Sequence, residues 1–287
     1  MLVVVVGLVT FLYMRPQANN DMAPEHEVST LKLADFTAIK VEFPTKAPTS
    51  FEKVDGLWRM TAPYKMRADQ LSVQRILAII AAKSVDKFPA TDLAKYGLDN
   101  PQLRLKLTNN QGEQAFSFGT FNPVTEEQYV AFNDAIYLLS GSYAEAASTQ
   151  ALEMIDKNVL TKEESKQIAG FDFSRLEQWE EVRLQVDIAD GEWKVNVPKA
   201  KVTQNEMNEW LDFSWKQAQA NKIELYTPDR NANYPSFAVK LKNGKRVRID
   251  KVQESPDLLL GRPDEGVMYH FNADVGFNML NPPLNLQ

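Results

Sequence analysis

The side chains that could carry acid–base or metal chemistry in this chain are two histidines, His26 and His270, and 38 aspartates and glutamates. His26 lies in the triplet Glu25-His26-Glu27, but three adjacent residues in a polar tract lack the preorganisation that a metal site needs. His270 has no partner at the spacing of a zinc-protease or serine-hydrolase motif. Cysteine is absent, which excludes disulfides, thiolate zinc sites and thiol catalysis. We therefore expect no metal, no cofactor and no catalytic residue, and a hydrolase with paired carboxylates is the least favoured alternative.

Two tryptophans, Trp58 and Trp193, are candidates for ligand recognition, because aromatic side chains are frequent at recognition surfaces. Each follows an Asp-Gly pair and shares an alternating face with apolar residues such as Met60 and Val195. Large side chains in that setting are more often buried, so we favour core packing over recognition. The Asp-Gly pairs predict tight turns, and the chain contains no glycine-rich phosphate-binding motif.

The two tryptophans belong to a pattern that occurs twice. Asp, Gly, Trp and Pro recur at a constant offset (190 − 55 = 135, 198 − 63 = 135). Pro101 is matched by Pro235 at an offset of 134. The structural motif residues are Asp55, Gly56, Trp58, Pro63, Gly97 and Pro101 in the first copy, and Asp190, Gly191, Trp193 and Pro198 in the second. Two copies of one module are the simplest explanation.

Each copy predicts antiparallel strands followed by a helix. Residues 36–43 alternate apolar and polar side chains, and residues 51–62 predict two strands joined at Asp55-Gly56, the strongest short signal of a β-hairpin. Asp69 is placed to cap the next helix, and Thr203 with Glu206 has the spacing of a capping box in the second copy. The expected fold class is α+β, a tandem duplication of an antiparallel-sheet-plus-helix module preceded by an N-terminal membrane anchor.

The predicted organisation has five parts. Residues 2–14 are uncharged and strongly apolar, so we interpret 1–14 as a membrane anchor or uncleaved signal. We expect the true start to lie upstream, because a bilayer span needs about 20 apolar residues. Residues 15–34 are polar and contain proline, which predicts a flexible linker. The first α+β repeat then covers 35–141, a helical connector 142–170, and the second α+β repeat 171–287.

Length and charge restrict the possible partners. With 287 residues the chain is long enough for two domains that each bury a core. Its formal net charge of −6 opposes binding to a polyanion, because affinity for nucleic acids depends mainly on contacts between basic residues and phosphates. We therefore expect no nucleic-acid partner.

With these motifs in place, the chain resembles a bacterial envelope family catalogued as a domain of unknown function, number forty-three-forty. The resemblance rests on the hairpin motif around Trp58, the element Tyr96-Gly97-Leu98-Asp99 with Pro101, and Gly119 with the pair Tyr129-Val130. The second copy departs from it, because Tyr234-Pro235 lacks the preceding Gly-Leu. The resemblance implies an N-terminal anchor and a body outside the cytoplasmic membrane. It also implies that the protein is a neighbour of ABC-2-type permeases and gliding-motility-like auxiliary proteins. It implies no catalytic residue.

The expected function is that of a membrane-anchored, non-catalytic accessory or scaffolding protein of a bacterial envelope complex, associated with an ABC-type transporter. The expected location is the cytoplasmic (inner) membrane, with a single span and the folded body in the periplasm or outside the cell. The expected partners are the membrane, through the N-terminal helix, and a membrane protein such as a transporter permease. The alternative is a periplasmic module that binds a glycan, a peptide or a lipid headgroup.

Overall fold

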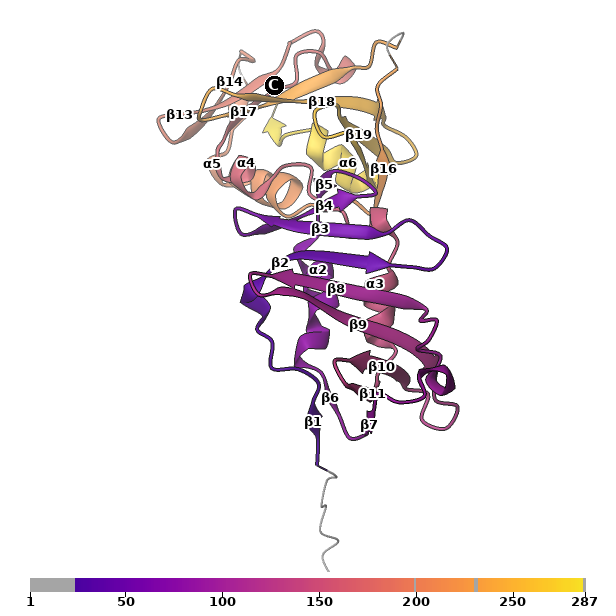
Figure 1. The fold of residues 1–287 in the computed structure, drawn as a ribbon. Coiled ribbons are helices and arrows are strands. Elements are labelled where there is room, and N and C mark those ends of the chain that lie inside the picture. The colour runs from indigo at the N-terminus through magenta and orange to yellow at the C-terminus, as the bar shows by residue number, and fades with distance from the viewer. Residues whose placement is uncertain (1–23, 199, 230–231, 286–287) are drawn as a thin grey trace, which may run out of the picture. The chain divides into compact units, whose positions relative to one another are not determined.

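The computed structural model describes residues 24–198, 200–229 and 232–285 (Figure 1). Contacts within the chain divide these residues into two units. Unit 1 holds the described residues up to Pro48 together with Arg75–Ser148, and unit 2 holds Thr49–Gln74 together with the described residues from Thr149 onward. In the described ranges no helix is both long and apolar enough to span a bilayer. The predicted anchor at 1–14 and the first part of the predicted linker, 15–23, lie outside the described residues.

The remainder of the predicted linker has fixed contacts within unit 1. Strand β1 (His26–Glu27) pairs antiparallel with β6 (Lys83–Ser84). Val28 is 3% exposed, and its backbone N–H donates to the carbonyl of Ala82 at 3.0 Å. Ordered structure therefore begins no later than His26, upstream of the predicted start of the first repeat.

Unit 1 is built around antiparallel strands in the order β2-β8-β9-β10-β11-β7, several of which lie side by side in Figure 1. Their bounds are β2 (Phe36–Glu42), β8 (Leu103–Asn109), β9 (Gly112–Phe121), β10 (Gln128–Phe132), β11 (Ala135–Leu139) and β7 (Lys87–Pro89). Alternation along the strands places residues such as Ile39, Leu105 and Phe116 on the buried face. The strand predicted over 36–43 is confirmed.

Short helical segments complete unit 1. They are η1 (Leu33–Asp35), η2 (Ala78–Ala81), η3 (Leu93–Tyr96) and α3 (Ser142–Ser148). Helix α2 (Gln70–Leu77) contains the division between the two units. Asp69 precedes α2, and its Oδ1 accepts a hydrogen bond from the backbone N–H of Ser72 at 2.7 Å, which confirms the predicted helix cap.

Unit 2 contains an eight-stranded antiparallel sheet in the order β14-β13-β12-β17-β18-β19-β20-β16. Its strands are β12 (Ile168–Asp172), β13 (Gln185–Ala189), β14 (Glu192–Val195), β16 (Lys222–Leu225), β17 (Ser236–Leu241), β18 (Arg246–Gln253), β19 (Leu258–Arg262) and β20 (Val267–Phe271). Unit 2 also holds β3 (Thr49–Val54), β4 (Leu57–Ala62) and β5 (Met66–Arg67), which pair antiparallel in that order. Strand β15 (Lys201–Val202) pairs with β21 (Leu284–Asn285).

The helical segments of unit 2 are short. They are η4 (Ala151–Met154), α4 (Lys162–Lys166), η5 (Glu177–Trp179), α5 (Gln204–Trp210), the π-helical segment η6 (Leu211–Lys216) and α6 (Ala273–Leu280). The stretch predicted as a helical connector, 142–170, therefore holds α3, η4 and α4 and the start of β12. With mostly antiparallel sheets and few helices, the α+β fold class is confirmed.

Three tryptophans donate hydrogen bonds to the carbonyl groups at the C-terminal end of α6. The last carbonyls of a helix lack partners within the helix. Here the indole N–H groups of Trp210, Trp215 and Trp179 donate to the carbonyls of residues 278, 279 and 280, at 2.6, 3.2 and 2.9 Å. These side chains are therefore buried with their polar atoms satisfied, which fixes α6 in the core of unit 2.

The capping box predicted at Thr203 and Glu206 is wrong. Thr203 precedes α5, but its side chain makes no capping hydrogen bond, and the first turn is instead held through Gln204, as described below. A capping box does form at α4, where Thr161 Oγ1 accepts from the backbone of Glu164 at 3.0 Å and the Glu164 carboxylate accepts from the backbone of Thr161 at 2.8 Å.

Candidate functional site

The duplicated Asp-Gly pairs form the turns of two β-hairpins. Asp55 and Gly56 have φ angles of 51° and 80°, and Asp190 and Gly191 have 57° and 81°. Two consecutive positive φ angles are what a type I′ hairpin turn requires. The tryptophans that follow are buried, with 6% of Trp58 and 4% of Trp193 exposed, which confirms the core interpretation.

A glutamine clamps the backbone of each tryptophan. Gln70 Oε1 accepts from the backbone N–H of Trp58 at 2.9 Å, and its Nε2 donates to the carbonyl of Trp58 at 2.9 Å. Gln204 does the same to Trp193, at 2.7 and 3.1 Å. The offset between the glutamines is 134 (204 − 70), one less than between the tryptophans. Neither glutamine belongs to the repeated motif recognised in the sequence, although each is the first residue of the helix that follows the repeated hairpin.

Replacing Gln204 or Gln70 with alanine should lower the free energy of unfolding of unit 2 by about 1–2 kcal/mol each, because the side chain's hydrogen bonds to the backbone are lost, two at Gln204 and three at Gln70. All five tryptophans (58, 179, 193, 210 and 215) lie in unit 2, so urea unfolding followed by tryptophan fluorescence measures this unit alone. The exposed Gln219→Ala is the matched control. Equal stability of all three variants and the wild type would contradict a clamping role.

The remaining motif residues have packing or turn positions. In unit 1 Gly97 ends η3 with φ 65°, and Pro101 is buried just before β8. A Cβ atom at Gly119 would lie 2.1 Å from the carbonyl oxygen of Tyr96, so only glycine allows this close approach of η3 to β9. Pro63 and Pro198 are exposed and follow β4 and β14. None of these five prolines and glycines lines the pocket described next.

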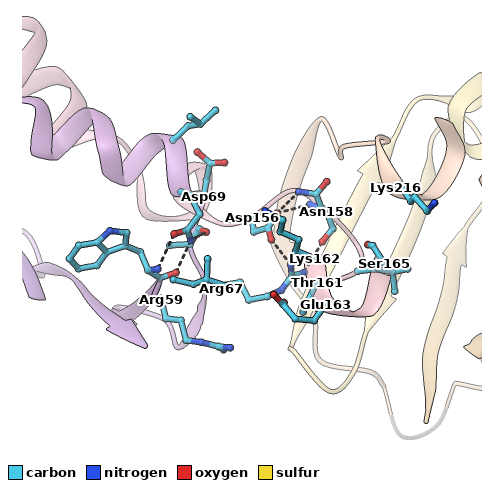
Figure 2. Close-up of a pocket in the computed structure, with 16 residues that line it drawn as sticks. Arg59, Arg67, Asp69, Asp156, Asn158, Thr161, Lys162, Glu163, Ser165 and Lys216 are labelled. Atoms are coloured by element: carbon cyan, nitrogen blue, oxygen red, sulfur yellow. Dashed lines mark hydrogen bonds and ion pairs between the residues drawn. The ribbon is translucent and has the colours of Figure 1, made fainter. Parts of the chain in front are cut away.

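Unit 2 contains a pocket of about 370 Å³ with a mixed polar and apolar lining. Figure 2 shows its lining side chains, which come from β4, β5 and the start of α2 on one side and from the segment around α4 on the other. The charged lining residues are Arg59, Arg67, Asp69, Asp156, Lys162, Glu163 and Lys216. The apolar ones include Leu57 and Leu71, which are 38% and 63% exposed.

Arg67 is the most constrained charge of this pocket, with a side chain that is 13% exposed. Its guanidinium pairs with the Asp156 carboxylate and donates to the carbonyl of Asn158 at 2.6 Å. It also makes a two-point contact with the Glu265 carboxylate, at 3.1 Å for each hydrogen bond, and donates to Tyr269 Oη at 2.9 Å. Arg67 therefore ties β5 to the segment before α4 and to the turn between β19 and β20.

A second arginine, Arg262, extends the network with a side chain that is only 2% exposed. It donates to the Glu164 carboxylate at 2.8 Å, to Asp264 at 2.6 Å and to the carbonyl of Val159 at 2.8 Å. Its Nη1 also lies 3.6 Å from Glu265 Oε1, the atom that accepts from Arg67. The two arginines thus share one carboxylate.

The network shifts the pKa of its members in directions that keep them charged or hydrogen-bonded. Burial alone would raise the pKa of Glu164, but the hydrogen bonds from Arg262 and the backbone of Thr161, together with the charges of Arg262 and Arg67, outweigh it and hold that pKa below the ordinary value. The pKa of Asp264 is lowered in the same way. Burial raises the pKa of Tyr269, so its hydroxyl stays protonated and donates to Glu265 Oε2 at 3.0 Å.

Neither histidine lines the unit 2 pocket or belongs to the network of Arg67 and Arg262. His26 lies in β1 and His270 in β20, where its Nε2 is 3.5 Å from a Glu224 carboxylate oxygen. Within the described part of the chain no group of three or more potential ligands could hold a metal ion. The arrangement in unit 2 can form ion pairs, hydrogen bonds and apolar contacts with a bound segment.

Sequence reasoning missed this pocket because its members are far apart in the chain. Arg67 and Glu265 are separated by 198 residues. The one local signal is the T-x-x-E spacing of Thr161 and Glu164, which places Glu164 at the start of α4. That signal predicts a helix start but not the partner of its carboxylate.

The structure defines an α+β protein with a network of charged residues beside a pocket. These features do not by themselves identify an activity. The family model described as Domain of unknown function (DUF4340) matches residues 58–236, which is more than half of the chain. The chain belongs to this family. The match includes the pocket residues from Trp58 to Lys216 but ends before Arg262 and Glu265. No curated protein and no solved structure matches the chain.

Proposed function

We propose that the protein is a non-catalytic accessory component of a bacterial envelope complex and that the pocket of unit 2 holds a segment of its protein partner. The observation that carries the proposal is a difference among the cations that line this pocket: one is paired inside the protein, and others are exposed. Arg67 is fully engaged inside the protein, whereas Arg59 and Lys162 make no ion pair within the described part of the chain. The buried charge organises the pocket, and the free cations face a partner.

The lining favours a polypeptide segment with an acidic group next to an apolar side chain. Arg59 and Lys162 are exposed cations that a carboxylate can pair with. Leu57 and Leu71 are exposed apolar side chains that a partner can cover. A peptide supplies both chemistries in a short length.

We further propose that the body arose by tandem duplication. The identical glutamine clamp on Trp58 and Trp193 supports this, because turn, tryptophan and clamping side chain recur together. The offset of 134 at Gln70 and Gln204 agrees with that of Pro101 and Pro235 in the sequence. Duplication explains why both copies retain a hairpin followed by a capped or clamped helix.

The proposed location is the outer face of the cytoplasmic membrane, with residues 1–14 as the anchor. The apolar run 2–14 and the resemblance to an envelope family support this location. The partner that we expect is the permease of an ABC-type transporter. Binding of a free glycan, peptide or lipid headgroup is the alternative that the experiment below separates from it.

Photocrosslinking in native membranes tests the proposal. We expect p-benzoylphenylalanine at Leu71 to crosslink to a membrane protein, identified by mass spectrometry. The same probe at Phe277 is the matched control, because Phe277 is equally exposed in unit 2, 64% against 63%, and does not line the pocket. Charge reversal by Arg59→Glu with Lys162→Glu should abolish the Leu71 crosslink. Equal crosslinking at both sites, or no protein adduct at Leu71, would contradict the proposal.

A further inference from the structure

Unit 1 contains a separate pocket of about 640 Å³. Its walls include the rings of Phe43 and Phe121, and Phe121 is 49% exposed. A Cβ atom at Gly141 would lie 2.9 Å from Phe121 Cε1, so the missing side chain lets this ring lie against the backbone. The volume is within the usual range of small-molecule sites, about 300–1,000 Å³.

Gln128, which lines this pocket, is a polar residue on the core-facing side of β10 and is only 1% exposed. Its Nε2 donates to the carbonyl of Gly119 at 2.9 Å, which sets the orientation of the amide. Its Oε1 is buried and has no hydrogen-bond partner within the described residues. A buried acceptor without a donor is unfavourable by about 1–3 kcal/mol and is uncommon in folded proteins.

The strand geometry brings this amide to the pocket. Gln128 is paired with Phe121 of β9, and the register between β9 and β10 shifts between Gln128 and Val130. A β-bulge at such a point redirects side chains, and bulges are frequent beside binding sites. Paired residues on neighbouring strands share a face, so the amide and the Phe121 ring belong to the same site.

The charges of this pocket are balanced. Its charged lining residues are Lys46 and Glu145, one of each sign. Lys46 Nζ also lies 5.7 Å from the centroid of the Phe43 ring. Ser142 and Ser148 are the serines of the lining. A ligand for this site therefore needs no net charge, an apolar face for the rings and a hydroxyl or amide donor for Gln128 Oε1.

We propose that the unit 1 pocket binds a neutral saccharide, with a sugar face on Phe121 and a sugar hydroxyl donating to Gln128 Oε1. A saccharide ring combines an apolar face of C–H groups with hydroxyl donors at its edge. The apolar face can pack on the phenylalanine rings of this pocket, and a hydroxyl can donate to Gln128 Oε1. This site goes beyond the proposed function, which uses residues of unit 2 only. The two proposals can therefore fail independently.

Saturation-transfer difference NMR on the full-length chain in detergent tests this site, with maltose, cellobiose and N,N′-diacetylchitobiose as probes at millimolar concentration. We expect transfer to at least one probe. Gln128→Met and Phe121→Ala should each weaken binding by at least about tenfold. Phe213→Ala is the matched control, because Phe213 is 63% exposed but lies in unit 2, and it should leave binding unchanged.

Two further readouts exclude trivial explanations. Far-UV circular dichroism checks that the variants are folded. If Gln128→Met is not folded, the test relies on Phe121→Ala. Because no tryptophan lies in unit 1, binding there should leave tryptophan fluorescence unchanged. Absence of transfer to all three probes would overturn the proposal, and so would wild-type affinity in the folded variants. A loss of affinity in Phe213→Ala equal to that in Phe121→Ala would also overturn it.

Discussion

Replacing Arg262 with methionine should lower the free energy of unfolding of unit 2 by about 3–5 kcal/mol, the usual effect of removing one partner of a buried ion pair. The side chain is 2% exposed, and without it Glu164 and Asp264 lose the guanidinium that pairs with them, while Glu265 keeps its pair with Arg67. Urea unfolding followed by tryptophan fluorescence measures the effect. Lys194→Met is the control, because the Lys194–Asp190 pair is exposed and should contribute less than about 1 kcal/mol.

The pH dependence of the Arg262→Met effect has a definite sign. In the wild type the pKa values of Glu164 and Asp264 are lowered, so their contribution to stability is present above the pKa of the unfolded chain, about 4, and is lost as pH falls. In the variant both carboxylates lack the guanidinium that favours their charged form, so protonation costs less there than in the wild type. The stability difference between wild type and variant should therefore be largest near neutral pH and shrink below about pH 4. A difference that is constant with pH would contradict the ion-pair explanation.

Replacing Arg67 with methionine should lower the free energy of unfolding of unit 2 by about 3 kcal/mol. We expect a smaller effect than at Arg262, because 13% of the Arg67 side chain is exposed against 2%. The same variant should abolish the partner crosslink at Leu71, since Asp156 and Asn158 lose the group that holds them at the pocket. The measurements are urea unfolding and the crosslinking yield under conditions where the variant is folded.

Two comparisons make the Arg67 prediction specific. Arg67→Lys keeps the charge but cannot reproduce the two-point contact with Glu265, so its stability should fall between those of the wild type and Arg67→Met. Because Arg67 and Arg262 share Glu265, the double variant should depart from additivity by more than about 0.5 kcal/mol. Full retention of stability in Arg67→Met, or strict additivity, would show that the shared network is not the source of stability.

Local patterns in the sequence determined the hairpins and several helix starts. The Asp55-Gly56 and Asp190-Gly191 turns are found where they were predicted, because positive φ at both positions depends on residue type within the turn itself. Asp69 caps α2 for the same local reason. The burial of both repeated tryptophans followed from their alternation with other apolar residues. The predicted capping box at Thr203 is wrong, because the Thr203 side chain makes no capping hydrogen bond; the side chain that ties the first turn of α5 to its hairpin is Gln204, which bonds the backbone of Trp193.

Neither candidate site could be predicted from the sequence. Arg67 meets Glu265 and Tyr269 across 198 and 202 residues, and nothing in the local sequence of a guanidinium indicates which carboxylate it will pair with. The unpartnered oxygen of Gln128 lies where the register between two strands shifts, which alternation alone does not reveal. The sequence by itself determined the α+β class, the turns and the repeated motif, since these depend on neighbouring residues. Only the tertiary structure decided which distant charges pair and which buried polar atoms lack a hydrogen-bond partner, because those outcomes depend on contacts between segments remote in the chain.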